Sequence, residues 1–136
     1  MIYEGTISYM KIDKNGNEKV IKESYIVDNV ETFADAELAL FEEFKSLNAI
    51  DIIAIKRSRL KEIANKRTKD DENVYVAEIA DKQINDNDEE VELIYKVALF
   101  AMFIDDAYAF AKEYLSQGYD MHLVGLRKTR IKDVLG

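Results

Sequence analysis

One strip of the sequence occurs twice, 71 positions apart, and this repeat constrains the fold more than any other feature. Residues 52–63 read IIAIKRSRLKEI and residues 123–134 read LVGLRKTRIKDV, and every aligned pair is identical or a close exchange. The same offset aligns FADAE, from residue 33, with IDDAY, from residue 104, and one residue of slack then pairs Tyr3 with Tyr75. An internal duplication accounts for such a match, so we expect two similar units.

The first copy, residues 1–63, predicts the order strand, strand, helix, strand. IYEGTISYMKI alternates apolar and polar residues, as a half-buried strand does, and Asn15-Gly16 favours a tight hairpin turn into KVIKESYIV. Thr32 and Asp35 match the N-cap and first-turn acid of a helix. IDIIAIKRSRLKEI is rich in β-branched residues and is expected to close the copy as one strand. The predicted helix carries its apolar stripe on Phe33, Ala36, Leu40, Phe44 and Leu47.

The second copy, residues 74–136, repeats this order, with Asp105 expected to cap its helix and Gly118 to end it in the left-handed conformation. Residues 64–73 are polar and charged, and are expected to form a solvated linker that includes Glu72. The predicted fold class is α+β. Two internally duplicated β-β-α-β units would form one pseudo-symmetric sheet-and-two-helix domain over residues 1–136, with the helices on one face of the sheet.

Composition narrows the possible chemistry. The chain has no cysteine, which excludes disulfides, thiolate zinc sites and a cysteine nucleophile, and its single histidine, His122, argues against histidine metal sites. Phosphate-binding glycine loops and the nucleophile elbow are absent. The calcium-like spacing of Asp13, Asn15 and Asn17 lacks the glycine and glutamate that a calcium loop needs, so it is interpreted as a hairpin turn. We therefore predict no catalytic residue, no metal and no cofactor.

Location is predicted from two further absences. No apolar run approaches the roughly 20 residues that span a bilayer, and the N-terminus lacks the pattern of an export signal. A cytoplasmic protein that does not associate with membranes is expected.

Positive charge is concentrated in the repeated strip, although the net charge of the chain is −8. Alternate residues of a strand share a face, about 6.6 Å apart, which is comparable to the phosphate spacing of a single-stranded nucleic acid. The strip would thus present three cations in each copy, and exposed tyrosines would stack on bases. The predicted phosphate contacts are Arg57, Arg59, Lys61, Lys128, Arg130 and Lys132, and the predicted stacking residues are Tyr9, Tyr25 and Tyr95.

The clustered cations of these strips also allow other interpretations. Cations along a strand often form a solvated face or pair with acids on a neighbouring strand, and this chain has 27 acidic residues. The leading expectation is a non-catalytic accessory protein that binds single-stranded nucleic acid, with single-stranded DNA as the expected ligand. The alternative is a protein-interaction or virion-structural module, including a homo-oligomer formed through exposed sheet edges. A metal-dependent enzyme with acids that converge in space is a third, weaker alternative.

Several segments, in order along the whole chain, resemble a family. SYIVDNVETFADAE, IIAIKRSRLKEI, VYVAEIADKQI and VGLRKTRIKDVLG are similar to a small domain-of-unknown-function family of Bacteroidetes and their phages, including crAss-like gut phages. The chain departs from that pattern in a less aromatic start and a more basic last strand. The resemblance implies a phage or mobile-element protein in a bacterial cytoplasm, and it transfers no catalytic or binding residue.

Overall fold

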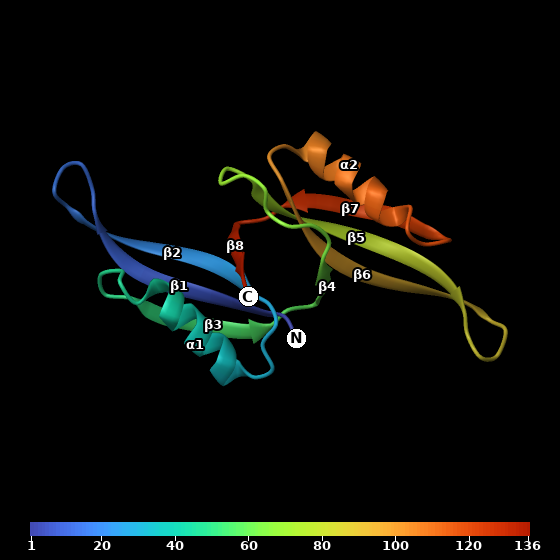
Figure 1. The fold of residues 1–136 in the computed structure, drawn as a ribbon, viewed down its shortest axis with the longest axis horizontal. Coiled ribbons are helices and arrows are strands. Elements are labelled where there is room, and N and C mark those ends of the chain that lie inside the picture. The colour runs from blue at the N-terminus through green and yellow to red at the C-terminus, as the bar shows by residue number, and fades with distance from the viewer. The chain divides into compact units, whose positions relative to one another are not determined.

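The chain folds into two compact units, each with a four-stranded sheet and one helix. The computed structural model describes all residues, 1–136. The first unit consists of Met1–Ser58 and Arg130–Gly136, and the second of Arg59–Thr129. Figure 1 labels the elements, which are β1 (Tyr3–Ile12), β2 (Glu18–Val27), α1 (Phe33–Phe44), β3 (Asp51–Arg57), β4 (Leu60–Ile63), β5 (Asn73–Ile84), β6 (Glu90–Ala101), α2 (Ile104–Leu115), β7 (Met121–Lys128) and β8 (Ile131–Leu135).

The sheet of the first unit has the strand order β3-β1-β2-β8. β1 runs antiparallel to β2 and β3, whereas β8 runs parallel to β2. The predicted turn at Asn15-Gly16 is confirmed, and Gly16 has a φ of 79°, which glycine adopts at little steric cost. The Asp13 carboxylate accepts hydrogen bonds from the backbone N–H groups of Asn15 and Asn17, both at 2.9 Å, so it closes the turn.

The sheet of the second unit has the same form, with the order β7-β5-β6-β4. β5 runs antiparallel to β6 and β7, and β4 runs parallel to β6. Ile53 in β3 and Val124 in β7 are each an extra residue at a register shift. These β-bulges occupy equivalent positions of the repeated strip, so the likeness of the two sheets extends to their irregularities.

The strands differ from the prediction in number and continuity. Residues 51–63 form two strands, and the chain passes from the first unit to the second between Ser58 and Arg59. Residues 121–135 likewise form two strands, and the chain returns to the first unit after Thr129. Each sheet therefore takes its fourth strand from the other half of the sequence. The α+β class is confirmed, but the expected single pseudo-symmetric sheet is not formed, because the eight strands make two four-stranded sheets.

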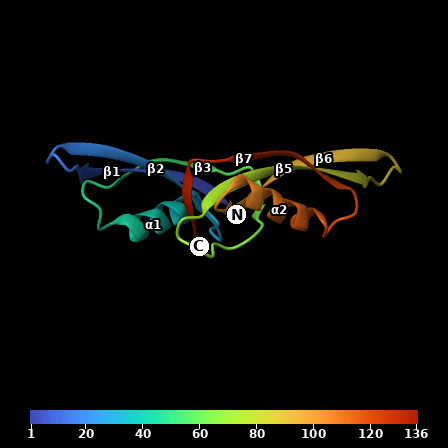
Figure 2. The ribbon, with the colours of Figure 1, turned by 90° about the horizontal axis from the view of Figure 1, so that it is seen from above.

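One helix covers one face of each sheet (Figure 2). In the first unit, Tyr3 and Ile7 of β1 pack with Ala36 and Leu40 of α1. Gly5, between those two strand residues, lies directly beneath the Leu40 side chain, and a methyl group at this position would overlap Leu40 Cδ1. The second core contains Tyr75, Ala77, Ile79, Val97, Leu99, Ala101, Ala107 and Ala111.

Of the three predicted helix ends, only the N-terminus of α1 is confirmed. Thr32 is the N-cap of α1, and its hydroxyl accepts a hydrogen bond from the Asp35 N–H at 3.1 Å, as expected. The N-cap of α2 is Phe103, not Asp105, and no side chain caps this helix. α2 ends at Leu115 in right-handed geometry through Ser116, and Gly118 does not have a positive φ, so the predicted left-handed end was wrong.

Residues 64–72 form an ordered loop on the second unit instead of a solvated linker. Asn65 exchanges two hydrogen bonds with the backbone of Phe100, at 2.7 and 3.0 Å, and Glu72 is only 8% exposed. The Glu72 carboxylate accepts from the N–H of Lys69 at 2.8 Å and from the N–H and hydroxyl of Thr68. Burial acts to raise the pKa of Glu72, but these hydrogen bonds and the charge of Arg67 outweigh it, so the pKa is lowered.

Candidate interaction surfaces

The six predicted phosphate contacts are divided between the two units. Arg57, Arg130 and Lys132 belong to the first unit, and Arg59, Lys61 and Lys128 belong to the second. Alternation of side chains applies only along a continuous strand, and both strips are broken between their first and second cations. The predicted face of three cations per strip is therefore not formed by a single strand.

Half of these cations already have partners inside their own unit. The Arg57 guanidinium Nη2 lies 2.8 Å from the Met1 sulfur, Lys132 Nζ lies 4.0 Å from a Glu23 carboxylate oxygen, and Lys61 Nζ lies 4.1 Å from the centre of a tyrosine ring. The other half form no ion pair and are exposed to solvent. These are Arg59, Lys128 and Arg130.

Two of the predicted stacking residues meet in the first unit, around Glu23. The Tyr25 hydroxyl donates to a Glu23 oxygen at 3.3 Å, and its ring packs on Phe44 with 4.6 Å between centroids. Burial raises the pKa of Tyr25, and the Glu23 charge raises it further. Burial and Glu23 raise the pKa of Tyr9 in the same way. Tyr25 is only 8% exposed, so it offers no ring to a base.

The equivalent place in the second unit holds Tyr95, the third predicted stacking residue. Its hydroxyl lies 3.1 Å from the Met121 sulfur, and Lys61 lies over its ring. Next to it, the Tyr114 hydroxyl donates to a Glu62 oxygen at 2.5 Å. Burial, this hydrogen bond and the Glu62 charge raise the pKa of Tyr114. Lys61 and Glu62 of β4 contact the tyrosines of the second unit, and Lys132 of β8 pairs with Glu23 beside Tyr25 in the first, so these tyrosines have a structural role.

The outward face of α1 carries apolar side chains that sequence reasoning did not single out. Leu38 is 59% exposed and Phe41 is 46% exposed, although Ala36 and Leu40 on the opposite face are fully buried. The alignment places Ala109 and Lys112 of α2 at the positions of Leu38 and Phe41. The signal was present in the sequence, because Leu38 and Phe41 are spaced i, i+3 outside the predicted stripe.

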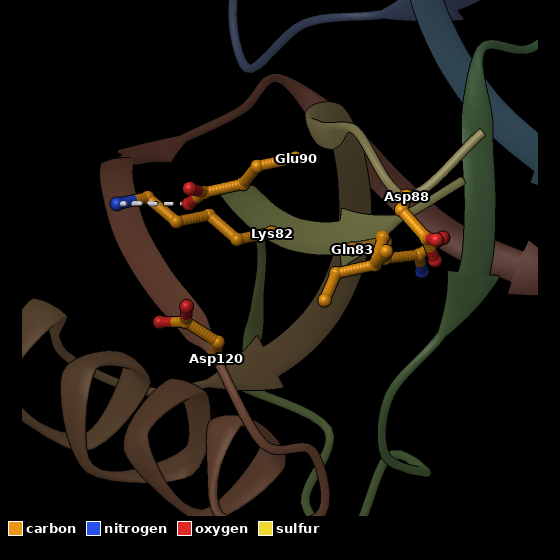
Figure 3. A pocket seen from close by; sticks show the side chains of 6 residues that line it. Lys82, Gln83, Asp88, Glu90 and Asp120 are labelled. Atoms are coloured by element: carbon orange, nitrogen blue, oxygen red, sulfur yellow. Dashed lines mark ion pairs between the residues drawn. The ribbon is translucent and has the colours of Figure 1, made fainter. Parts of the chain in front are cut away.

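A shallow pocket lies on the second unit where its hairpin passes the start of β7 (Figure 3). Its volume is about 510 Å³, and Lys82 and Glu90 form an ion pair of 3.8 Å at one side. In Figure 3 these two side chains point together, away from Asp88. The other lining residues are Gln83, Ile84 and Asp120.

Two properties of the chain bear on the enzyme and membrane alternatives. No group of three or more His, Cys, Asp or Glu side chains is arranged to hold a metal ion. None of the helices combines the length and apolar character needed to cross a membrane.

Comparison with known proteins identifies the family and nothing narrower. Neither the curated proteins nor the solved structures contain a match to this chain. One family model does match, over the whole span of the segments that resemble a family in the sequence. The chain belongs to the family described as a domain of unknown function (DUF4494), whose model matches residues 1–136.

Proposed function

We propose that this protein is a non-catalytic protein-interaction module that binds its partner through the outward face of α1. The observation that carries this proposal is the exposure of Leu38 and Phe41 on a helix whose other face already fills the core of the first unit. Leu38 and Phe41 are thus large apolar side chains on the solvent side of α1, and exposed apolar residues that cluster mark a candidate interaction site.

The charge around this face indicates the chemistry of the partner. Five exposed carboxylates lie on or next to the helix, and the single lysine at its end pairs with Glu42 at 2.9 Å. A partner with an apolar strip flanked by lysine or arginine would bury Leu38 and Phe41 and neutralise the acids. The acids are Glu31, Asp35, Glu37, Glu42 and Glu43.

The test uses two double variants with opposite expectations. Leu38→Glu/Phe41→Glu should abolish capture of a partner by the immobilised protein, because it places charge at the centre of the apolar face. It should leave the free energy of unfolding within about 0.5 kcal/mol, since both side chains are exposed. The control, Ala109→Glu/Lys112→Glu, places two glutamates at the equivalent positions of α2 and should keep the capture. Equal capture by all three proteins, confirmed with the purified partner, would contradict the proposal.

Binding to single-stranded nucleic acid is a second candidate function, favoured by one observation. Arg59, Lys128 and Arg130 are exposed and form no ion pair, so they are free to contact phosphates. Base stacking by Tyr25 has no support, because its ring is buried. This candidate therefore rests on electrostatics alone.

Fluorescence polarisation with a labelled strand of 20–30 nucleotides tests the second candidate. The protein should bind at low salt, the affinity should fall steeply as salt rises, and Arg59→Glu/Lys128→Glu/Arg130→Glu should remove binding. A variant with the same change of charge elsewhere, Lys45→Glu/Lys56→Glu/Lys112→Glu, should retain it. If no binding occurs at low salt, where electrostatic attraction is strongest, the nucleic-acid function is wrong.

A separate inference concerns the origin of the two units. We infer that the two units descend from one duplicated β-β-α-β ancestor whose copies exchanged their last strands. The equivalent bulges at Ile53 and Val124 and the identical strand orders support this inference. The setting in a phage-infected bacterial cytoplasm stays a prediction from the resemblance.

A further inference from the structure

The two long hairpins end in arms of the same backbone form and opposite charge. Residues 10–22, the basic arm, form the outer part of the β1–β2 hairpin, and residues 82–94, the acidic arm, form the outer part of the β5–β6 hairpin. Figure 2 shows each hairpin continuing past the helix of its own unit. In both arms the first turn residue, Asp13 or Asn85, accepts two backbone N–H groups at 2.9–3.0 Å.

The charges of the arms do not follow from this shared geometry. The basic arm has four lysines and two acids, a net charge of +2. The acidic arm has five acids and one lysine, a net charge of −4. The charged residues are Lys11, Lys14, Lys19, Lys22, Asp13 and Glu18 on the basic arm, and Lys82, Asp86, Asp88, Glu89, Glu90 and Glu92 on the acidic arm. The same turn forms with either set, so formation of the hairpin does not require the difference in charge.

Charges within each arm are largely unpaired. Lys11 and Lys19 lie directly opposite each other across the hairpin, and like charges in this arrangement destabilise a strand pair. No lysine of the basic arm forms an ion pair, and the acidic arm has only the pair between Lys82 and Glu90. An acidic surface placed on the basic arm would relieve the repulsion between Lys11 and Lys19.

Both arms also expose large apolar side chains. Ile12 is 64% exposed on the basic arm, and Ile84, at the equivalent position, is 73% exposed on the acidic arm. Two-stranded ribbons are marginally stable without a further packing surface. Apolar contact and charge attraction would therefore act together wherever the two arms meet.

We propose that copies of this chain associate with each other, the basic arm of one copy lying against the acidic arm of another. Each copy carries both halves of this contact, so association produces either a closed dimer with two such contacts or a head-to-tail series. The contact uses residues separate from the outward face of α1, so it stands or falls independently of the proposed function.

Charge exchange between the arms tests this proposal on the full chain. Sedimentation velocity over a range of protein and salt concentrations should show reversible association that weakens as salt increases. Lys11→Glu/Lys14→Glu/Lys19→Glu should weaken association at least tenfold, and Asp86→Lys/Glu89→Lys/Glu92→Lys should do the same. A variant with all six substitutions carries −4 and +2 on the exchanged arms and should associate again, as should an equimolar mixture of the two triple variants.

The controls separate this contact from other effects of charge. Lys45→Glu/Lys56→Glu/Lys112→Glu changes the net charge equally outside the arms and should leave association unchanged, as should Leu38→Glu/Phe41→Glu. Circular dichroism of each variant establishes that it is folded. A wild type that stays monomeric at low salt, or a six-substitution variant that stays dissociated while folded, would overturn the proposal. Binding of the basic arm to duplex DNA by a monomeric protein would also overturn it.

Discussion

At the scale of single residues, the two cores solve the same packing problem in different ways. The first unit sets a glycine on the strand against a leucine on the helix, Gly5 beneath Leu40. The alignment places Ala77 and Ala111 at these positions, both fully buried in the second core. The first unit thus pairs a leucine with a glycine where the second unit pairs two alanines.

A double-mutant cycle at Gly5 and Leu40 tests this exchange of volume. Gly5→Ala alone should destabilise the first unit by about 1–3 kcal/mol, because the added methyl overlaps Leu40. Leu40→Ala alone should cost about 2–5 kcal/mol through the cavity it leaves. The pair Gly5→Ala/Leu40→Ala recreates the arrangement of the second unit, so its cost should be smaller than the sum by about 0.5–3 kcal/mol.

Urea unfolding of the four proteins measures these free energies. The control is Ala77→Gly, which removes a buried methyl without steric conflict and should cost about 1–2 kcal/mol. Strict additivity of Gly5→Ala and Leu40→Ala would show that the close approach between them does not matter for stability.

At the scale of elements, local signals predicted what local interactions determine. The turn at Asn15-Gly16, the Thr32 cap and the inward stripe of α1 each depend on residues within a few positions of one another, and all three are present. The α2 cap failed because Asp105 lies inside the first turn and the exposed Phe103 occupies the cap position. A run of acids at a helix start marks the first turn more reliably than the cap itself.

The interruption of the two long strands could not be predicted in this way. Neither Ser58 nor Arg59 is a glycine or a proline, so the break carries no local signal of a turn. The chain divides there because Leu60–Ile63 pair with β6 and Arg57 is the last residue to pair with β1. Strand pairing between distant segments decided the break, and the predicted face of cations was lost with it.

At the scale of the whole molecule, the C-terminal segment belongs to one half by sequence and to the other by structure. The two assignments predict that it stabilises different sheets. The sequence repeat assigns residues 130–136 to the second half, whereas the structure pairs β8 with β2 in the first unit. The Asp28 N–H also donates to the Leu135 carbonyl at 2.7 Å. The strand is therefore expected to protect the sheet of the first unit.

Hydrogen exchange of a truncated chain distinguishes the two assignments. Deletion of residues 130–136 exposes the edge of β2 and removes Leu135 from the first core, so peptides from β2 should exchange faster while those from β6 and β7 keep their protection. The reciprocal change, Glu62→Pro in β4, should accelerate exchange in β6 and spare β2, because proline fits poorly within a paired strand. Faster exchange in β7 than in β2 after the deletion would mean that β8 stabilises the half that its sequence repeats.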